Sequence, residues 1–165
     1  MPEFWDLYNE KGEKTGVKHK RGQPIPQGLY HLVVSAWIVN SRGQFLLSQR
    51  HPDKPCPLYW ECTGGSVLAG ENSLDGAIRE VKEELGIELD RSAARLLFQT
   101  RRDSTQDFYD VWLFQADVPI QALNLQETEV VNARWVDKDE LLDMFRTEKL
   151  HPLIDYISTY KIFSK

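Results

Sequence analysis

One segment of the chain, residues 64–87, combines a strong helix pattern with features that weaken a helix. Its sequence is GGSVLAGENSLDGAIREVKEELGI, with several glycines and closely spaced glutamates. Asn72 has the right type and place to cap a helix, and Gly86 to end it. Apolar residues recur at the spacing of one buried helical stripe, at Leu74, Ala77, Ile78, Val81 and Leu85.

The acidic residues of this segment gather on one face of the predicted helix. At about 100° per residue, Glu80, Glu83 and Glu84 lie side by side next to the buried stripe. Each pair of like charges one turn apart costs roughly 0.2–0.5 kcal/mol, and Gly76 on the same face costs about 1 kcal/mol. Arg79, four residues before Glu83, offsets only one repulsive pair. Local penalties without local compensation usually mark a functional site.

A divalent cation would compensate the crowded carboxylates. Mg²⁺ prefers hard oxygen ligands and is usually held by a few carboxylates together with waters and substrate phosphates. We expect Gly76 to leave an open patch on this face, where an ion, a water or a phosphate approaches. The alternative is an ordinary acidic helix face that meets only solvent.

The rest of the chain alternates strand patterns with fewer helical ones. A short N-terminal hairpin is predicted within residues 3–20, and the proline-rich residues 51–59 are predicted to form an exposed loop. Helices are predicted over 138–147 and 151–163. Strands are predicted over 31–40, 44–50, 59–64, 94–104, 108–118 and 132–137. This order favours one layered α/β domain over residues 1–165, built on a mixed sheet.

The composition limits the classes of function. Hydrophobic residues make up 41% and charged residues 27%, which is typical of a soluble globular protein. The formal net charge of −5 gives no support for binding to a nucleic-acid polymer, although a metal ion can still attract a phosphorylated small molecule. No apolar stretch is long enough to cross a membrane, and the N-terminus has no secretory pattern. We therefore expect a cytoplasmic protein whose cysteines, Cys56 and Cys62, are reduced thiols.

The segment matches the pattern G-x5-E-x7-R-E-U-x-E-E-x-G-U, where U is aliphatic, at every fixed position. The matching residues are Gly65, Glu71, Arg79, Glu80, Val81, Glu83, Glu84, Gly86 and Ile87. The chain therefore resembles the Nudix hydrolases, whose box is this pattern, here over residues 65–87. The resemblance implies an α/β/α sandwich in which the box forms a loop, a helix and a loop. It also implies hydrolysis of a diphosphate bond, with Mg²⁺ or Mn²⁺, in a nucleoside diphosphate linked to another group or in a related small-molecule diphosphate.

Sequence outside the box is similar to the isopentenyl-diphosphate-isomerase-like branch of this superfamily. The N-terminal hairpin, GLYH at 28–31 and QRHPDKPCPLYW at 49–60 carry this similarity. The isomerases place a catalytic cysteine immediately before the first box glycine and a metal-binding histidine immediately after it, where this chain has Gly64 and Ser66. Of their two earlier metal-binding histidines, only the later has a counterpart, His31. The resemblance therefore favours a hydrolase, with the isomerase and a non-catalytic Nudix ligand sensor as alternatives.

The resemblance also assigns roles to individual residues. Glu80 and Glu84 are expected to bind the metal, with Glu83 as a third ligand or as the residue that orients the attacking water. Arg79 would hold a glutamate in place, and Glu129, before the last strand, is expected to add a further carboxylate. The expected catalytic residues are therefore Glu83, Glu80, Arg79 and Glu129. The expected substrate-binding residues include Gly65 and Glu71 of the box. Outside the box, and from residue type rather than from the resemblance, they include Arg50 and Lys54, as cations that could meet a phosphate, and Trp60, which could stack on a base.

Other residues carry weaker signals. Glu127 is the alternative to Glu129, and the adjacent Arg101 and Arg102 are further cations that could meet a phosphate. His31 is expected to be a structural histidine whose ring nitrogens are satisfied. Aromatic residues at strand positions are more often core, which is the expectation for Trp37, Trp112 and Trp135. The expected partner is a small-molecule diphosphate or a nucleotide, and the oligomeric state is left open.

Overall fold

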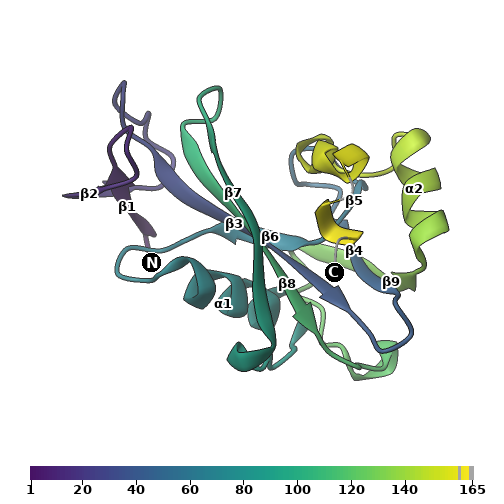
Figure 1. The fold of residues 1–165 in the computed structure, drawn as a ribbon. Coiled ribbons are helices and arrows are strands. Elements are labelled where there is room, and N and C mark those ends of the chain that lie inside the picture. The colour runs from purple at the N-terminus through teal and green to yellow at the C-terminus, as the bar shows by residue number, and fades with distance from the viewer. Residues whose placement is uncertain (160, 164–165) are drawn as a thin grey trace.

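The computed structural model describes residues 1–159 and 161–163. A seven-stranded mixed sheet has helices on both faces, and a separate two-stranded hairpin lies at the N-terminal end (Figure 1). The strands are β1 (Phe4–Tyr8), β2 (Lys14–Lys20), β3 (His31–Val39), β4 (Phe45–Arg50), β5 (Trp60–Glu61), β6 (Thr63–Ser66), β7 (Ala94–Arg102), β8 (Asp107–Gln115) and β9 (Val130–Val136). The α-helices are α1 (Ser73–Leu85) and α2 (Lys138–Arg146), and the 3₁₀ helices are η1 (Arg91–Ala93), η2 (Ile120–Ala122), η3 (Pro152–Thr159) and η4 (Lys161–Phe163). This architecture confirms the α/β class and the N-terminal hairpin expected from the sequence.

Strand β3 connects the two halves of the main sheet. It runs parallel to β8 along its whole length, and β7 continues the sheet beyond β8. β3 meets β4 only at Val39 opposite Phe45, and β6 pairs with β3 where β4 has moved away. β4 pairs instead with β5 and β9. The segment 59–64, expected to be one strand, is therefore two short strands, because it passes from β4 to β3 where those strands have diverged.

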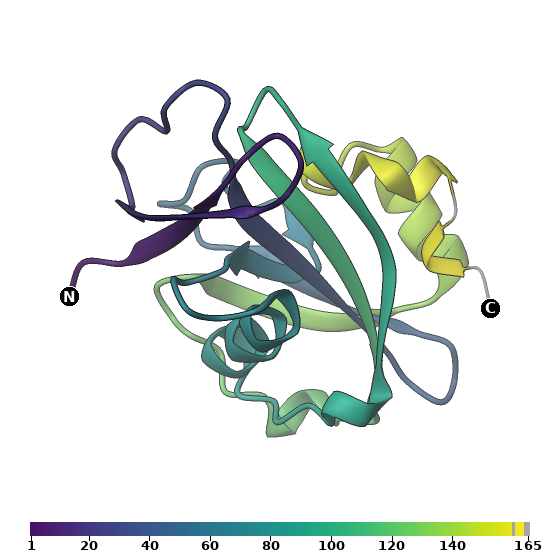
Figure 2. The same cartoon turned by 60° about the vertical axis from the view of Figure 1, so that its left-hand side comes forward.

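Alternate residues of β3 contribute to two hydrophobic cores, one on each face of the sheet. Ala36 and Ile38 pack in the core that contains the apolar stripe of α1. Trp37, between them in sequence, is fully buried in the core beneath α2 and η3. Figure 2 shows α1 and α2 on opposite sides of the sheet. Trp112 and Trp135 pack, partly buried, against the α1 core. Each of the three tryptophans expected in the core therefore contacts one of the two cores.

The C-terminal helices differ in kind from one another. α2 begins after Asp137, whose side chain accepts a hydrogen bond from the Glu140 backbone N–H, and it matches the helix predicted over 138–147. The helix predicted over 151–163 forms instead as the two 3₁₀ helices η3 and η4. Ile154, with a non-helical φ of −98° and ψ of 35°, interrupts η3. Tyr160, within that range, lies outside the described residues. No helix in the described part of the chain is long and apolar enough to span a membrane.

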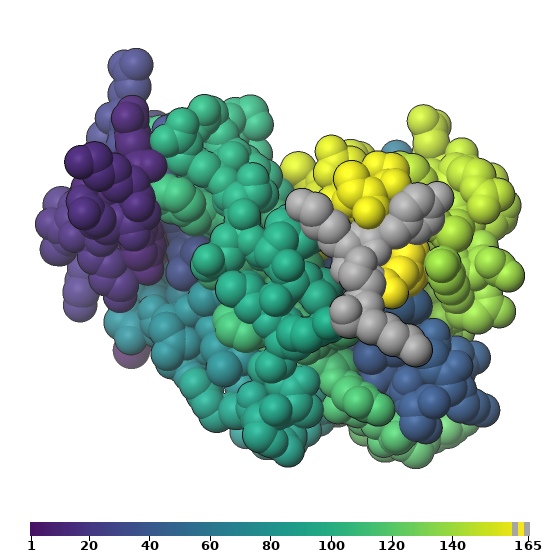
Figure 3. Space-filling model, in the orientation of Figure 1, coloured from purple at the N-terminus to yellow at the C-terminus, as the bar shows by residue number. Residues whose placement is uncertain are grey.

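The N-terminal hairpin packs against the loop that precedes α1. The Ala69 backbone N–H donates to the Phe4 carbonyl at 2.7 Å, and the Gly70 N–H donates to the Asp6 carboxylate at 2.9 Å. Leu7 on the same strand is fully buried. In Figure 3 the hairpin lies at one end of the visible face, away from the C-terminal segment. The hairpin is therefore attached to the part of the chain that carries the box.

His31, the first residue of β3, is held by packing. It is buried, and its ring stacks on Trp5 with centroids 4.1 Å apart. Its Nδ1 atom has no hydrogen-bond partner among the described residues, so the expectation of satisfied ring nitrogens is wrong. Burial lowers the pKa of His31 to about 4, although the nearby Asp107 carboxylate acts in the opposite direction. The stacked, desolvated environment therefore favours the neutral imidazole.

Replacement of His31 by Phe should make the fold less sensitive to acid. In the unfolded chain the imidazole gains a proton below its ordinary pKa of 6.5, whereas in the folded chain it does so only near pH 4. Between these values the unfolded state binds more protons, so stability falls as the pH falls. The full loss from this group is about 3 kcal/mol. Urea unfolding at about pH 7.5 and about pH 4.5 should show a smaller loss for His31→Phe than for wild type, and equal losses would contradict the assignment.

Candidate active site

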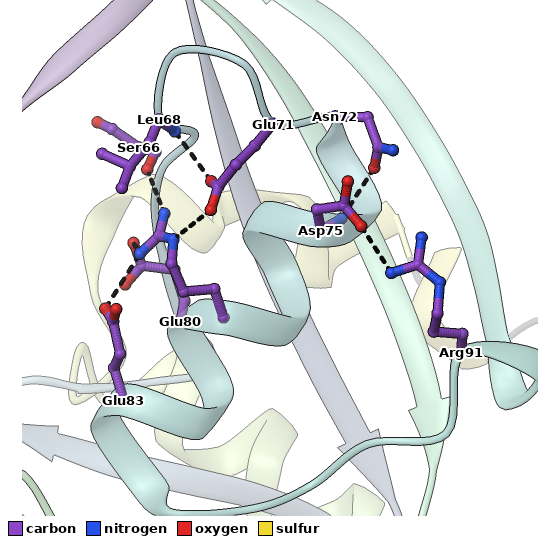
Figure 4. Close-up of polar contacts among 9 residues, drawn as sticks. Ser66, Leu68, Glu71, Asn72, Asp75, Glu80, Glu83 and Arg91 are labelled. Carbon is purple, nitrogen blue, oxygen red and sulfur yellow. Dashed lines mark hydrogen bonds and ion pairs between the residues drawn. The ribbon is translucent and has the colours of Figure 1, made fainter.

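The predicted helix of the box is α1, and its ends form as its sequence predicts. The Asn72 side chain accepts a hydrogen bond from the Asp75 backbone N–H at 2.9 Å (Figure 4). Gly86 closes the helix in the left-handed region, with φ 70°. Between these ends, Ala77, Val81 and Leu85 are buried in the core against the sheet. The buried apolar stripe therefore directs the neighbouring acidic face toward the loop before the helix.

Arg79 joins the acidic face of α1 to that loop. Its Nε atom lies 2.8 Å from Glu71 Oε1, and its Nη1 atom lies 2.8 Å from Glu80 Oε1 and 3.0 Å from Glu83 Oε2. Its Nη2 atom donates to the Ser66 carbonyl at 3.0 Å. The labelled glutamates converge in this way in Figure 4. Burial disfavours the charged guanidinium, but the carboxylates of Glu71 and Glu80 outweigh burial and raise the pKa of Arg79 above its usual value.

Two glycines of the box allow close approach rather than open space. A Cβ atom at Gly65 would lie 2.6 Å from the Glu80 carboxylate, so only glycine leaves that carboxylate in place. A Cβ atom at Gly76 would lie 2.8 Å from the Val67 side chain. Gly76 is therefore buried where α1 touches the loop. The expectation of an open patch at Gly76 is wrong, because the Val67 side chain fills that position.

The acidic face borders a cavity of about 460 Å³ between the box, the loop 51–59 and the loop before β9. Its walls carry Glu80, Glu83, Glu84 and Glu129, together with Gly65, Arg50 and Lys54. The structure thus brings together residues from distant parts of the sequence. Glu71 stands behind this wall and reaches it through Arg79.

Glu84 is the most deeply buried carboxylate of the cavity, with 5% of its surface exposed. Burial raises the pKa of Glu84 to about 8, although the charge of Lys54 acts against this rise. The Lys54 Nζ atom lies 4.0 Å from Glu84 Oε1 and makes a closer ion pair with Glu129. The charged form of Glu84 is therefore disfavoured in the free protein, because Lys54 compensates its burial only weakly.

The donor atoms fit a hard divalent cation. Glu80, Glu84 and Glu129 offer carboxylate oxygens, and a cation would compensate the buried charge of Glu84. Within the described residues no three Asp, Glu, His or Cys side chains form a group that could hold a metal ion by themselves. Glu80 is engaged by Arg79, and Lys54 contacts both Glu84 and Glu129. Mg²⁺ commonly takes one or two carboxylates and completes its shell with waters and phosphates, so two carboxylates, such as those of Glu80 and Glu84, would meet its need for protein ligands.

Arg50 and Trp60, both expected to contact substrate, are placed differently. Arg50 lines the cavity, but its Nη1 atom lies 2.7 Å from Glu61 Oε1, and its Nε donates to the Pro55 carbonyl at 2.8 Å. Trp60 lies outside the cavity, with the Arg134 guanidinium 4.9 Å from its ring centroid. Successive residues of a strand point to opposite faces, so when Glu61 faces Arg50 its neighbour Trp60 faces away. The structure therefore does not bring Trp60 to the site.

The weaker candidates also separate. Glu129 lines the cavity, whereas Glu127 is not among its walls. Arg102 borders a smaller cavity and is engaged by Asp107 at 2.7 Å. Arg101 borders neither cavity. Glu129 is therefore better placed than Glu127 to add a carboxylate to the cavity.

The smaller cavity, of about 300 Å³, adjoins the first at Gly64 and Gly65. Glu61, Cys62 and Tyr109 are among its walls. Burial raises the pKa of Cys62 to about 12, so this thiol stays protonated at neutral pH. Sequence reasoning missed Glu61, although a glutamate within a predicted short strand is a signal that could have found it.

Glu3 and Arg21 also line the larger cavity and were missed. Both belong to the N-terminal hairpin, far from the box in sequence. No local pattern marks either residue, because their position depends on how the hairpin packs against the loop before α1.

Known proteins resemble this chain in sequence and in structure. A family model described as NUDIX domain matches residues 29–156. An uncharacterized Nudix hydrolase of Listeria monocytogenes is 44% identical over 141 residues, which cover 84% of this chain and 82% of the relative. An isopentenyl-diphosphate Delta-isomerase of Shigella flexneri is 29% identical over 141 residues, which cover 82% of this chain and 78% of the relative. The crystal structure of DR0079 from Deinococcus radiodurans has a TM-score of 0.71 and 26% identity, and the match covers 90% of this chain and 91% of that chain.

These similarities agree with the complete box on α1 and with the mixed sheet. The family model covers most of the chain, and the Listeria relative matches over most of its own length. The lower identity to an isomerase agrees with the branch indicated outside the box. The chain belongs to the Nudix family, among its hydrolases.

Proposed function

We propose that this protein is a cytoplasmic, single-domain hydrolase that cleaves the diphosphate bond of a small molecule with the aid of Mg²⁺ or Mn²⁺. The substrate class is a nucleoside diphosphate linked to another group, or a related small diphosphate. The observation that carries the proposal is the buried and weakly compensated Glu84, which shares a cavity with Glu80 and Glu83. A cavity of about 460 Å³ suits a small molecule rather than a polymer.

In this proposal Glu80 and Glu84 hold the metal. Once bound, Mg²⁺ supplies positive charge that offsets the charge of the diphosphate and assists deprotonation of water. Gly65 leaves space for the Glu80 carboxylate at the wall of the cavity. Arg79 is a positioning residue, since it holds Glu80 at 2.8 Å from below the cavity surface.

Glu83 is the residue best placed to orient the attacking water. Its side chain is 52% exposed, and Arg79 holds one of its oxygens at 3.0 Å. The water oxygen forms a bond to phosphorus, its proton passes to the Glu83 carboxylate, and the bond from phosphorus to the bridging oxygen breaks. The leaving phosphate keeps the electron pair of that bond. Glu129 is the second candidate for accepting the proton, with Lys54 beside it.

The isomerase alternative meets a steric obstacle at Gly64. A Cβ atom there would collide with the Val34 carbonyl of β3 and lie 3.1 Å from Ser35 Oγ. A cysteine at this position would therefore require β6 to move away from β3, to which it is paired. The only described cysteine close to this position is Cys62, whose thiol is buried and protonated.

Replacement of Glu84 by Gln should reduce metal-dependent turnover by at least about 100-fold, because the metal supplies several kcal/mol of transition-state stabilisation. The variant should unfold at the same temperature as wild type or a higher one, since burial disfavours the charged form of Glu84 and Gln has no charged form. Phosphate release and thermal unfolding measure the two effects.

Glu88→Gln is the matched control, because Glu88 is an exposed glutamate that pairs with Lys82 away from the cavity. It should retain turnover. Full activity in Glu84→Gln would contradict the assignment of Glu84 as a metal ligand.

A substrate screen tests the proposed reaction against both alternatives. Nucleoside di- and triphosphates, nucleotide sugars and isopentenyl diphosphate are incubated with Mg²⁺ and with EDTA, and products of hydrolysis and of isomerisation are identified. We expect hydrolysis of at least one diphosphate, abolished by EDTA and restored by Mg²⁺ or Mn²⁺. Isomerisation without hydrolysis would favour the isomerase, and ligand binding without any product would favour the sensor.

Replacement of Gly64 by Ala should destabilise the protein by about 2 kcal/mol, because the added methyl group meets the Val34 carbonyl. Urea unfolding of this variant and of Ser66→Ala, a change in the same strand that adds no atoms, measures the effect. Wild-type stability in Gly64→Ala would remove the steric argument against a side chain at this position.

A further inference from the structure

Three cations line the larger cavity, and they differ in how firmly each is engaged. Arg50 is held by Glu61 and by a backbone carbonyl, and 12% of its side chain is exposed. Lys54 contacts Glu129 and Glu84, with 21% of its side chain exposed. Arg21 pairs with Glu3 at 2.6 Å, and 62% of its side chain is exposed. Arg21 is therefore the cation most accessible to a ligand that enters from solvent.

The position of Arg21 follows from the register of the hairpin. Phe4 of β1 lies opposite Lys20 of β2, so Glu3 and Arg21 face each other at the open end. The Arg21 backbone N–H donates to the Glu3 carbonyl at 2.9 Å, which extends the pairing by one step. The bond from Ala69 to Phe4, next to Glu3, fixes this end against the box loop. The two side chains are thus held at the rim of the cavity by backbone contacts.

The ion pair between Arg21 and Glu3 is easily exchanged. Exposed ion pairs contribute little to stability, because water screens both charges. An arginine forms stronger, often bidentate, hydrogen bonds to a phosphate group. A phosphate in the cavity can therefore replace the Glu3 carboxylate at small cost, whereas Arg50 would first have to leave a largely buried pair with Glu61.

We propose that Arg21 of the N-terminal hairpin binds a phosphate group of the substrate, and that Glu3 competes with this phosphate for the guanidinium. The inference rests on the proposed function for the nature of the ligand. It extends the site to a segment outside residues 29–156, the part of the chain that matches the family model. Arg21 is a substrate-binding residue in this scheme and takes no part in proton transfer.

Paired substitutions separate this role from a structural one. If the ion pair only stabilises the hairpin, removal of either charge has the same effect. If Arg21 binds phosphate, Arg21→Gln weakens binding and Glu3→Gln strengthens it, because the competing carboxylate is lost. Arg21→Lys should restore part of the affinity, since a lysine keeps the positive charge but cannot form bidentate hydrogen bonds to the phosphate.

The experiment measures KM and kcat on the best substrate of the screen, and equilibrium binding of inorganic pyrophosphate by calorimetry. We expect Arg21→Gln to raise KM and the pyrophosphate Kd by about tenfold or more with little change in kcat. Glu3→Gln should lower both constants. Arg91→Gln is the control, because Arg91 forms a similarly exposed pair with Asp75 at 2.6 Å away from the cavity.

Opposite effects of Arg21→Gln and Glu3→Gln support the inference. Equal effects of both variants, or an unchanged Kd in Arg21→Gln, would overturn it. If wild type hydrolyses no substrate but pyrophosphate binding still depends on Arg21, the proposed function fails while this inference stands. If hydrolysis occurs and the KM of Arg21→Gln is unchanged, the inference alone fails.

Discussion

The guanidinium of Arg79 is the contact on which the candidate site depends. It bonds to Glu71 and Ser66 in the loop before α1 and to Glu80 and Glu83 on the helix. A loop and a helix that meet only through apolar contacts could slide relative to each other, whereas these directional bonds fix their geometry. The acidic face of α1 is therefore fixed in position as part of the cavity wall.

The same site contains repulsion that Arg79 does not remove. Glu84 lies on the far side of the acidic face, buried and 4.0 Å from Lys54. The charged form of Glu84 is unfavourable in this environment, which is the reason for its raised pKa. Buried, crowded carboxylates reduce the stability of the free protein and are retained where a ligand compensates them. In the proposed function, a bound cation would relieve this unfavourable electrostatic energy.

Much of the box could be predicted from sequence, because its geometry is local. Helix periodicity and capping place Glu80, Glu83 and Glu84 on one face without knowledge of the rest of the fold. The role of Gly76 could not be predicted, because Val67 reaches it only after the loop has folded back. The side of the sheet on which Trp60 lies could not be predicted either, since a two-residue strand shows no alternation of apolar and polar residues.

The central claim is that the carboxylates of α1 form a cation site that is already present in the substrate-free protein. Calorimetric titration of Mn²⁺ into the substrate-free protein and into its Glu84→Gln variant tests it without any turnover. The account predicts saturable binding to wild type, an accompanying rise in unfolding temperature, and an affinity at least about tenfold weaker in the variant. Equal affinities for Mn²⁺ in the two proteins, or no binding to wild type, would contradict it.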